Sequence, residues 1–450
     1  MAEKSLLHRG FPLNILVIAL LMAFLATSVV YAVLENHKLS GGNILGGNVS
    51  YARISPDGKY AVFVGDVRID DRSELFSVRT HGGARIRLSH DLPEDCHFVS
   101  FTISQNSKYV VYYTEKGVIT PSHCGLYAVP IEGGSSIELD GPNLNRRVDS
   151  IKITSDGSHI LFVSRTSDFS SSMLFSVTAT GGDPVPITEE IVGSHIYEIT
   201  PDNQHVVILQ YFSSADTHSL ICSDFEGTQL PLVEDLQYIE YFEISSDGAY
   251  VVYEKEGVGD DELWSVKIDG RILTKLNGEL VPGGSISSFK ITPDSATVIY
   301  LADEVVVGMF QLYKVPISGI PSREPLTPWP MGNQITYKIS PDSQWVVYRA
   351  DAEIGDKLDL YSVPIESLVS DPYKLSVGMN NSGDVIIYEI TADSKGVVII
   401  ADAITPGDKE LFAVNMTGTW GERLNSDLPP FGDVEFFKIL NNSQGVVYLA

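Results

Sequence analysis

One unit of roughly 48 residues is repeated along almost the whole chain, a period typical of repeat architectures. Each copy has an isoleucine anchor, with Asp or Asn three residues later and a large apolar residue nine residues later. The nine anchors are Ile54, Ile103, Ile153, Ile199, Ile244, Ile291, Ile339, Ile390 and Ile439. A repeat of this period means one supersecondary unit per copy, which buries its apolar faces against neighbouring copies.

Each unit is predicted to contain four short β-strands. The Asp or Asn is followed by Gly, Ser or Asn, a pair that favours a tight turn, and apolar β-forming residues flank it. The third strand has the pattern Leu-aromatic-small-Val, as in 75–78, and the fourth is as short as 87–89. We assign the turn carboxylates a structural role because they recur in nearly every copy: Asp57, Asp156, Asp202, Asp247, Asp294, Asp342 and Asp393.

This pattern predicts an all-β fold, a β-propeller of four-stranded blades with eight complete repeats and a partial ninth over residues 36–450. Side chains alternate between the two faces of a strand. In the third strand, Leu and the small residue face one neighbouring sheet, while the aromatic residue and Val face the other. Both faces are therefore apolar, as stacked blades require.

The turn motif resembles that of the TolB-like propeller repeats, which are relatives of the WD-repeat families. Ile54-Ser55-Pro56-Asp57-Gly58 and Ile339-Ser340-Pro341-Asp342-Ser343 carry the resemblance. Members of that family include scaffolds of the cell envelope and the propeller halves of prolyl-oligopeptidase-type peptidases. The resemblance therefore implies a fold and leaves the function open.

The two ends of the repeat array do not match. The ninth unit stops after its second strand, at Ala450. Leu39 precedes Ile54 by the same interval at which Leu88 precedes Ile103, so 37–40 is predicted to be a fourth strand that could complete the last blade. That blade would still lack a third strand. Either it is three-stranded or the sequence is part of a longer chain, and we expect the latter because propellers usually have four to eight blades.

The N-terminus has the features of a targeting segment. Lys4 and Arg9 precede a stretch without formal charge, 10–34, whose most apolar part is 15–26. Residues 1–32 are therefore expected to be either a cleaved signal peptide or an uncleaved signal anchor. Both alternatives place the remaining chain outside the cytoplasm, and contact with a membrane is expected only through this segment, if it is retained.

Composition and motifs favour a binding protein. The net charge of −27 opposes binding to nucleic acid. The sequence contains no Gly-x-Ser-x-Gly, His-Glu-x-x-His or phosphate-loop motif. We expect a non-catalytic, extracytoplasmic scaffold that presents a rim to a protein or polymer partner. The alternative is the propeller domain of a prolyl-oligopeptidase-like peptidase whose catalytic domain lies beyond residue 450.

The three cysteines have separate expected roles. Cys96 and Cys124 lie before the first and third strands of one blade, at the same end, and an exported protein permits a disulfide between them. Because His97 and His123 adjoin these cysteines, zinc is a weaker alternative. Cys222 occupies the small-residue position of a third strand and is expected to be a buried, inert thiol.

Acidic loops between second and third strands are the remaining candidates for chemistry. The seventh repeat has Asp351, Glu353, Asp356 and Asp359, and similar loops occur around 66–71, 260–262 and 402–410. Carboxylate oxygens are ligands for calcium. The spacing varies between loops, so calcium is a hypothesis beside the alternative of solvated acidic loops. No other cofactor is expected.

Overall fold

A computed structural model describes Leu39 and residues 48–450 apart from 70–71, 93–95, 117–121, 142–146, 167, 214, 237, 257–260, 320–322, 329–334, 352–356, 367–371, 380–382, 405–406, 419–420 and 430–431. The expected targeting segment, 1–32, lies outside the described residues. The secondary structure assigned in the described part of the chain consists of β-strands, without a helix. None of its segments is a helix with the length and apolar character needed to cross a membrane.

The described residues form two compact units, an N-terminal unit (Leu39 and 48–326) and a C-terminal unit (327–450). The N-terminal unit has six antiparallel four-stranded sheets, each in sequence order. Their strands are β1 (Val49–Ile54), β2 (Tyr60–Gly65), β3 (Glu74–Arg79), β4 (Ile86–Arg87); β5 (Cys96–Ile103), β6 (Tyr109–Lys116), β7 (Ser122–Pro130), β8 (Ile137–Glu138); β9 (Arg147–Ile153), β10 (His159–Arg165), β11 (Ser172–Thr178), β12 (Val185–Pro186); β13 (Gly193–Ile199), β14 (Val206–Phe212), β15 (Thr217–Ser223), β16 (Gln229–Leu236); β17 (Ile239–Ile244), β18 (Tyr250–Lys255), β19 (Glu262–Lys267), β20 (Leu273–Lys275); and β21 (Ile286–Ile291), β22 (Thr297–Ala302), β23 (Gln311–Pro316), β24 (Glu324–Pro325).

The C-terminal unit has three sheets of four, three and two strands. They are β25 (Thr336–Ile339), β26 (Trp345–Ala350), β27 (Asp359–Pro364), β28 (Tyr373–Lys374); β29 (Val385–Ile390), β30 (Gly396–Ala401), β31 (Glu410–Asn415); and β32 (Phe436–Ile439), β33 (Val446–Leu449). The eighth repeat differs from the expected four strands, because its fourth strand is reduced to one bridge between Phe412 and Arg423.

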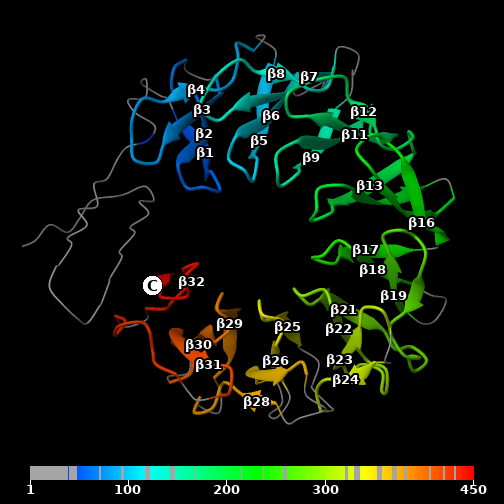
Figure 1. Cartoon of the computed structure of the whole chain (residues 1–450). Coiled ribbons are helices and arrows are strands. Elements are labelled where there is room, and N and C mark those ends of the chain that lie inside the picture. Colours follow the sequence, from blue (N-terminus) through cyan, green and yellow to red (C-terminus); the bar gives the residue numbers. More distant parts are fainter. Residues whose placement is uncertain are drawn as a thin grey trace, which may run out of the picture. The chain divides into compact units, whose positions relative to one another are not determined.

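The predicted all-β propeller is confirmed by this arrangement of repeated four-stranded blades. In Figure 1 the first strand of each sheet of the N-terminal unit lies on the inner side and the fourth on the outer side. Neighbouring sheets share apolar cores: Val62, Leu75 and Leu88 of the first blade pack with Val110 and Tyr112 of the second. Burial of such side chains contributes about 1.5–3 kcal/mol each.

The turn between the first two strands of a blade is built by the Asp and by the Ser or Thr two residues before it. Ser55 Oγ donates to Asp57 Oδ1 (2.7 Å), the Lys59 N–H donates to the same oxygen, and the Tyr60 N–H donates to Ser55 Oγ. The hydrogen bonds from Ser55 and then Lys59 lower the pKa of Asp57 to about 2. The predicted turn residues therefore lie in turns whose backbone they fix.

A serine next to the turn Asp links successive blades. Ser295 has a left-handed φ of 64°, a conformation that L-residues rarely adopt. Its Oγ accepts a hydrogen bond from the Asp247 N–H of the preceding blade (3.0 Å). Ser394 accepts in the same way from Asp342. The strained backbone is thus compensated by a contact between blades.

Leu39 is the one described residue of the expected strand at 37–40. It packs against Ala61, Phe63 and Phe76 on the face of the first blade opposite the one that contacts the second blade. Leu88 covers the equivalent face of the second blade. Leu39 and Leu88 stand at the same distance before their anchors, Ile54 and Ile103, and they pack on equivalent faces. No strand is assigned at Leu39.

Candidate functional site

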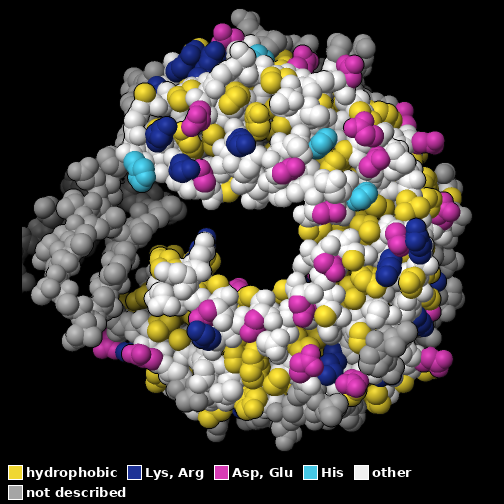
Figure 2. Space-filling model, viewed as in Figure 1, with side chains coloured by type: hydrophobic (Ala, Val, Ile, Leu, Met, Phe, Trp, Pro, Cys, Tyr) yellow, Lys and Arg dark blue, Asp and Glu magenta, His cyan; other side chains and the backbone are white. Residues whose placement is uncertain are grey.

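The inner strands carry side chains that differ between repeats at one fixed position. The residue before each anchor isoleucine is Arg53, Thr102, Lys152, Glu198, Glu243 or Lys290 in the N-terminal unit, and Lys338, Glu389 or Lys438 in the C-terminal unit. Figure 2 shows basic and acidic side chains mixed along the inner edge of the N-terminal unit. The inner edge of the N-terminal unit therefore carries charges of both signs.

These side chains contact the next blade in a repeated manner. The Lys152 ammonium lies 5.2 Å from the centre of the Tyr197 ring and pairs with Glu198. Lys338 lies 5.1 Å from the Tyr388 ring and pairs with Glu389 at 2.6 Å. The four side chains are between 35% and 52% exposed, so each pair contributes at most about 1 kcal/mol to stability.

Three consecutive inner strands form a hollow of about 370 Å³ at the turn end of the N-terminal unit. The anchors Ile103, Ile153 and Ile199, at the ends of β5, β9 and β13, supply its apolar wall. The polar wall consists of Thr102, Gln105, Lys152, Ser155, Glu198, Thr200 and Asn203. The hollow is therefore built from equivalent positions of three blades.

Two polar groups in this hollow have free hydrogen-bonding capacity. Gln105 is exposed, and within the described residues its side-chain amide makes no hydrogen bond. Glu198 is 52% exposed and uses only one carboxylate oxygen for Lys152. By contrast, Asn203 Oδ1 accepts the Ser155 N–H (2.7 Å) and is part of the scaffold. The arrangement can bind a polar ligand through one amide and one carboxylate.

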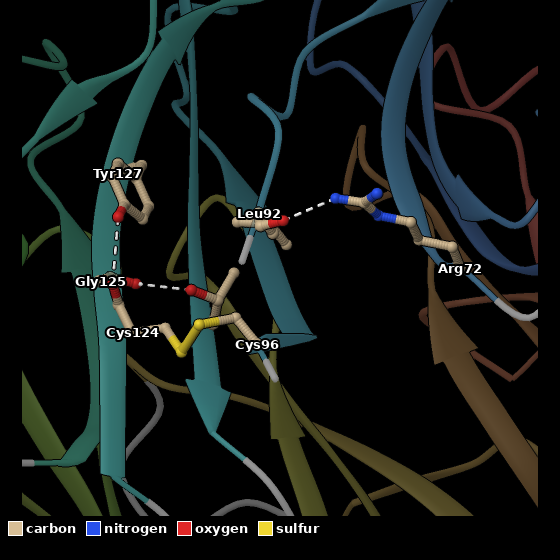
Figure 3. Close-up of a disulfide and its surroundings, with 7 residues drawn as sticks. Arg72, Leu92, Cys96, Cys124, Gly125 and Tyr127 are labelled. Carbon is tan, nitrogen blue, oxygen red and sulfur yellow. Dashed lines mark hydrogen bonds between the residues drawn. A yellow bond between two sulfur atoms is a disulfide. The ribbon is translucent and has the colours of Figure 1, made fainter. Parts of the chain in front are cut away.

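The structure joins Cys96 and Cys124, the pair that the sequence singled out. The bond connects the start of β5 to β7 across the intervening β6, and Tyr127 donates to the Cys124 carbonyl beside it (Figure 3). The side chains of the adjoining His97 and His123 are outside the part of the structure that is described. Cys222 is buried, and burial raises the pKa of its thiol to about 11.

The calcium hypothesis finds no support in the residues that the structure describes. Glu353 and Asp356 lie outside them. The Asp359 carboxylate is 1% exposed and is bound by Lys374 (2.8 Å), Lys357 (3.4 Å) and Ser376 (2.6 Å). Two ammonium groups at this carboxylate oppose a cation there. No group of three His, Cys, Asp or Glu in the described ranges could hold a metal ion.

Several acids of these loops form ion pairs at the outer edge of the blades, between the third and fourth strands. Each lies directly before the Leu of a third strand and pairs with a base directly before the Leu of the fourth. The pairs are Glu74–Arg87 (3.0 Å), Glu262–Lys275 (2.9 Å), Asp359–Lys374 (2.8 Å) and Glu410–Arg423 (2.8 Å). The sequence analysis noticed three of these acids, Glu262, Asp359 and Glu410. It missed Glu74 and the bases, although their shared position before Leu was a usable signal.

A serine–histidine contact that the sequence analysis also missed lies between the third and fourth blades. Ser172 Oγ lies 3.0 Å from His195 Nδ1, and both residues are buried. Burial, followed by the charge of Arg165, lowers the pKa of His195 to about 4. Ser172 also donates to the Gly193 carbonyl (3.1 Å). A pair shielded from solvent in this way is structural, because a substrate could not reach it.

The comparisons with known proteins bear on the fold and not on the function. The sequence matches no protein-family model and no curated protein. A eukaryotic initiation factor is 13% identical with a TM-score of 0.50, covering 85% of this chain and 90% of that one. A TolB from Agrobacterium tumefaciens is 16% identical (TM-score 0.32, covering 51% and 79%), and a prolyl endopeptidase is 11% identical (0.42, covering 75% and 51%). The first likeness concerns the fold alone, and the other two are too distant to carry an argument.

Proposed function

We propose that this protein is an extracytoplasmic, non-catalytic propeller of the TolB-like type that holds a polar segment of a protein or polymer partner. The observation that carries the proposal is the hollow between the ends of β5, β9 and β13. It combines an apolar wall with the half-exposed carboxylate of Glu198 and with the amide of Gln105, which is unpaired among the described residues. A few polar groups on an otherwise preformed concave surface are typical of binding sites.

Two further features support this proposal. The disulfide between Cys96 and Cys124 suits an oxidising compartment outside the cytoplasm. The turn motif Ile-Ser-Pro-Asp, present in the first and seventh repeats, supports the TolB-like assignment. The charges at the hollow are balanced within the Lys152–Glu198 pair, so a neutral or mixed-charge segment suits it better than a strongly charged polymer.

Site-specific crosslinking in the native host tests the proposal. A photoreactive amino acid at Gln105 of the full chain is expected to give a discrete adduct with the partner. The same group at His81, an exposed residue in a turn between β3 and β4, is the matched control and should give none. An adduct at both positions, or at neither, would contradict binding in the hollow.

A further inference from the structure

A second surface of the N-terminal unit lies at the opposite end of the strands from the hollow. The loop between β22 and β23 contains three consecutive valines and a methionine that are all exposed: Val305 (58%), Val306 (42%), Val307 (55%) and Met309 (40%). No residue from Val305 to Phe310 carries a charge. A contiguous apolar run of this kind on an acidic protein is unusual and marks an interaction surface.

The structure holds this loop in one shape. Asp303 is buried, and its two carboxylate oxygens accept the N–H groups of Ser285 and Gly308. Gly308 has a left-handed φ of 77°, which suits glycine, and the Met309 N–H closes a turn on the Val306 carbonyl (3.0 Å). The valines are thus displayed on a preorganised tip, which lowers the entropic cost of binding.

The acid beside the valines is withdrawn from the surface. Glu304 is buried, accepts a hydrogen bond from the Tyr300 hydroxyl (2.8 Å) and pairs with Arg323 (2.6 Å). Because Asp303 and Glu304 are both occupied inside the protein, neither charge opposes contact of the tip with an apolar surface.

An acidic group from the neighbouring blade adjoins the tip. Asp261 Oδ2 accepts the Ile286 N–H (3.2 Å), while Asp303 accepts the N–H of the preceding residue, so the two loops meet at the start of β21. Burial, followed by the charges of Asp261, Glu240 and Glu256, raises the pKa of Glu254 to about 8. Ile239 pairs with Lys255, so the exposed residues Glu240 and Glu256 lie at the same end of this blade as the loop that contains Asp261.

We infer that the valine tip (305–309) and the adjoining acidic group (Glu240, Glu256 and Asp261) form a docking surface for a protein partner that carries an apolar socket flanked by Lys or Arg. The apolar tip supplies the anchor, and the acids supply attraction and orientation. The acids disfavour the alternative of a bilayer, whose surface is commonly anionic. This surface lies apart from the hollow, so either can fail without the other.

A synthetic amphipathic peptide of Leu and Lys is a suitable probe, with a Leu and Glu peptide of the same pattern beside it. Binding to the full chain is measured by fluorescence anisotropy. We expect the Leu/Lys peptide to bind wild type, with at least a tenfold loss in the V305S/V306S/V307S variant. Glu240→Gln with Glu256→Gln should lower the affinity several-fold and weaken its dependence on salt. The Leu/Glu peptide should bind at least tenfold more weakly.

The matched control is I272S/L273S, which removes two exposed apolar residues (48% and 50%) at the opposite end of the neighbouring blade. Its affinity should equal that of wild type. Equal binding by the valine and control variants would overturn the inference. Sedimentation with phosphatidylcholine vesicles that is lost in the valine variant, without peptide binding, would reassign the tip to a bilayer and overturn it as well. Circular dichroism of each variant confirms that it is folded.

Discussion

The outer edge and the inner ends of the blades use the same repeat in opposite ways. At the outer edge, the N–H of the third-strand Leu is bound by the residue after the fourth-strand Leu or Ile in blade after blade: Ser89, Asp140, Thr188, Asn277, Ser376 and Asn425. At the inner ends, the residue before the anchor changes between Arg, Thr, Lys and Glu. A repeated bond maintains the fold, whereas a varied position leaves room for a binding site.

The largest effect is expected from the outer edge of the seventh blade. Asp359→Asn leaves Lys357 (8% exposed) and Lys374 (24% exposed) without their carboxylate. An unpaired buried charge costs about 3–5 kcal/mol of the free energy of unfolding. Glu262→Gln, at the same position of the fifth blade, is the comparison. Because Glu262 is 25% exposed, its loss should cost only about 1 kcal/mol. Denaturant midpoints measure both, and equal losses would contradict the burial argument.

The disulfide of the second blade should come next. Cys96→Ser with Cys124→Ser opens a loop whose ends are separated by 28 residues, which corresponds to about 3.5 kcal/mol of chain entropy in the unfolded state. Dithiothreitol should lower the denaturant midpoint of unfolding of the wild type and leave that of the double variant unchanged. Cys222→Ala keeps the disulfide and should retain the sensitivity to reductant. A wild type that is insensitive to reductant would show that the bond does not contribute.

Asp140 breaks the outer-edge pattern by placing a carboxyl where other blades have neutral groups. Burial raises its pKa to about 7. Because the folded pKa exceeds that of the unfolded chain, the folded state binds more protons, and stability falls as pH rises from about 4 through 7. Asp140→Asn, the residue used at positions 277 and 425, removes this dependence.

We expect the Asp140→Asn variant to gain about 2 kcal/mol at pH 8, which is below the full value of roughly 4 kcal/mol because the new amide must also be desolvated. At pH 4 the two proteins should be close to equal. Thermal unfolding across this pH range checks the result. A variant that is destabilised at pH 8 would mean that the hydrogen bonds to the charged carboxylate, such as that from the Leu126 N–H, outweigh the cost of its burial.

The smallest effect on stability is expected at the inner ends. Lys152→Ala with Glu198→Ala removes a pair whose side chains are 35% and 52% exposed, so the free energy of unfolding should change by less than about 1 kcal/mol. Crosslinking to the partner through position 105 should nevertheless be lost. A large loss of stability would remove the contrast between a structural outer edge and a binding inner surface.

The repeat made most of the fold predictable. The turn Asp residues, the third-strand pattern and the position of Leu39 all followed from constant spacings, because a residue that recurs at one place in every blade meets the same neighbours there. The fourth strand of the eighth blade did not follow. Leu424 is 38% exposed, whereas its counterpart Leu375 is fully buried. Only one bridge, between Phe412 and Arg423, is formed there.

The candidate sites were less predictable. The acidic loops were visible in the sequence, yet the base that pairs with Asp359 is Lys374 of the following strand, which meets it only when the two strands align. The hollow needs side chains from Ile103, Ile153 and Ile199, which belong to three successive repeats. The run of three valines can be read in the sequence, but its exposure depends on the two backbone N–H groups that hold Asp303.

The sequence by itself thus determined the strand order, the turns and the stacking of blades, because these depend on local periodicity and on contacts that recur at one fixed period. Only the tertiary structure decided which charged groups are paired, which polar groups at the hollow stay free and which apolar residues reach the surface. Those outcomes depend on distances between side chains from different strands and blades, which no single spacing encodes.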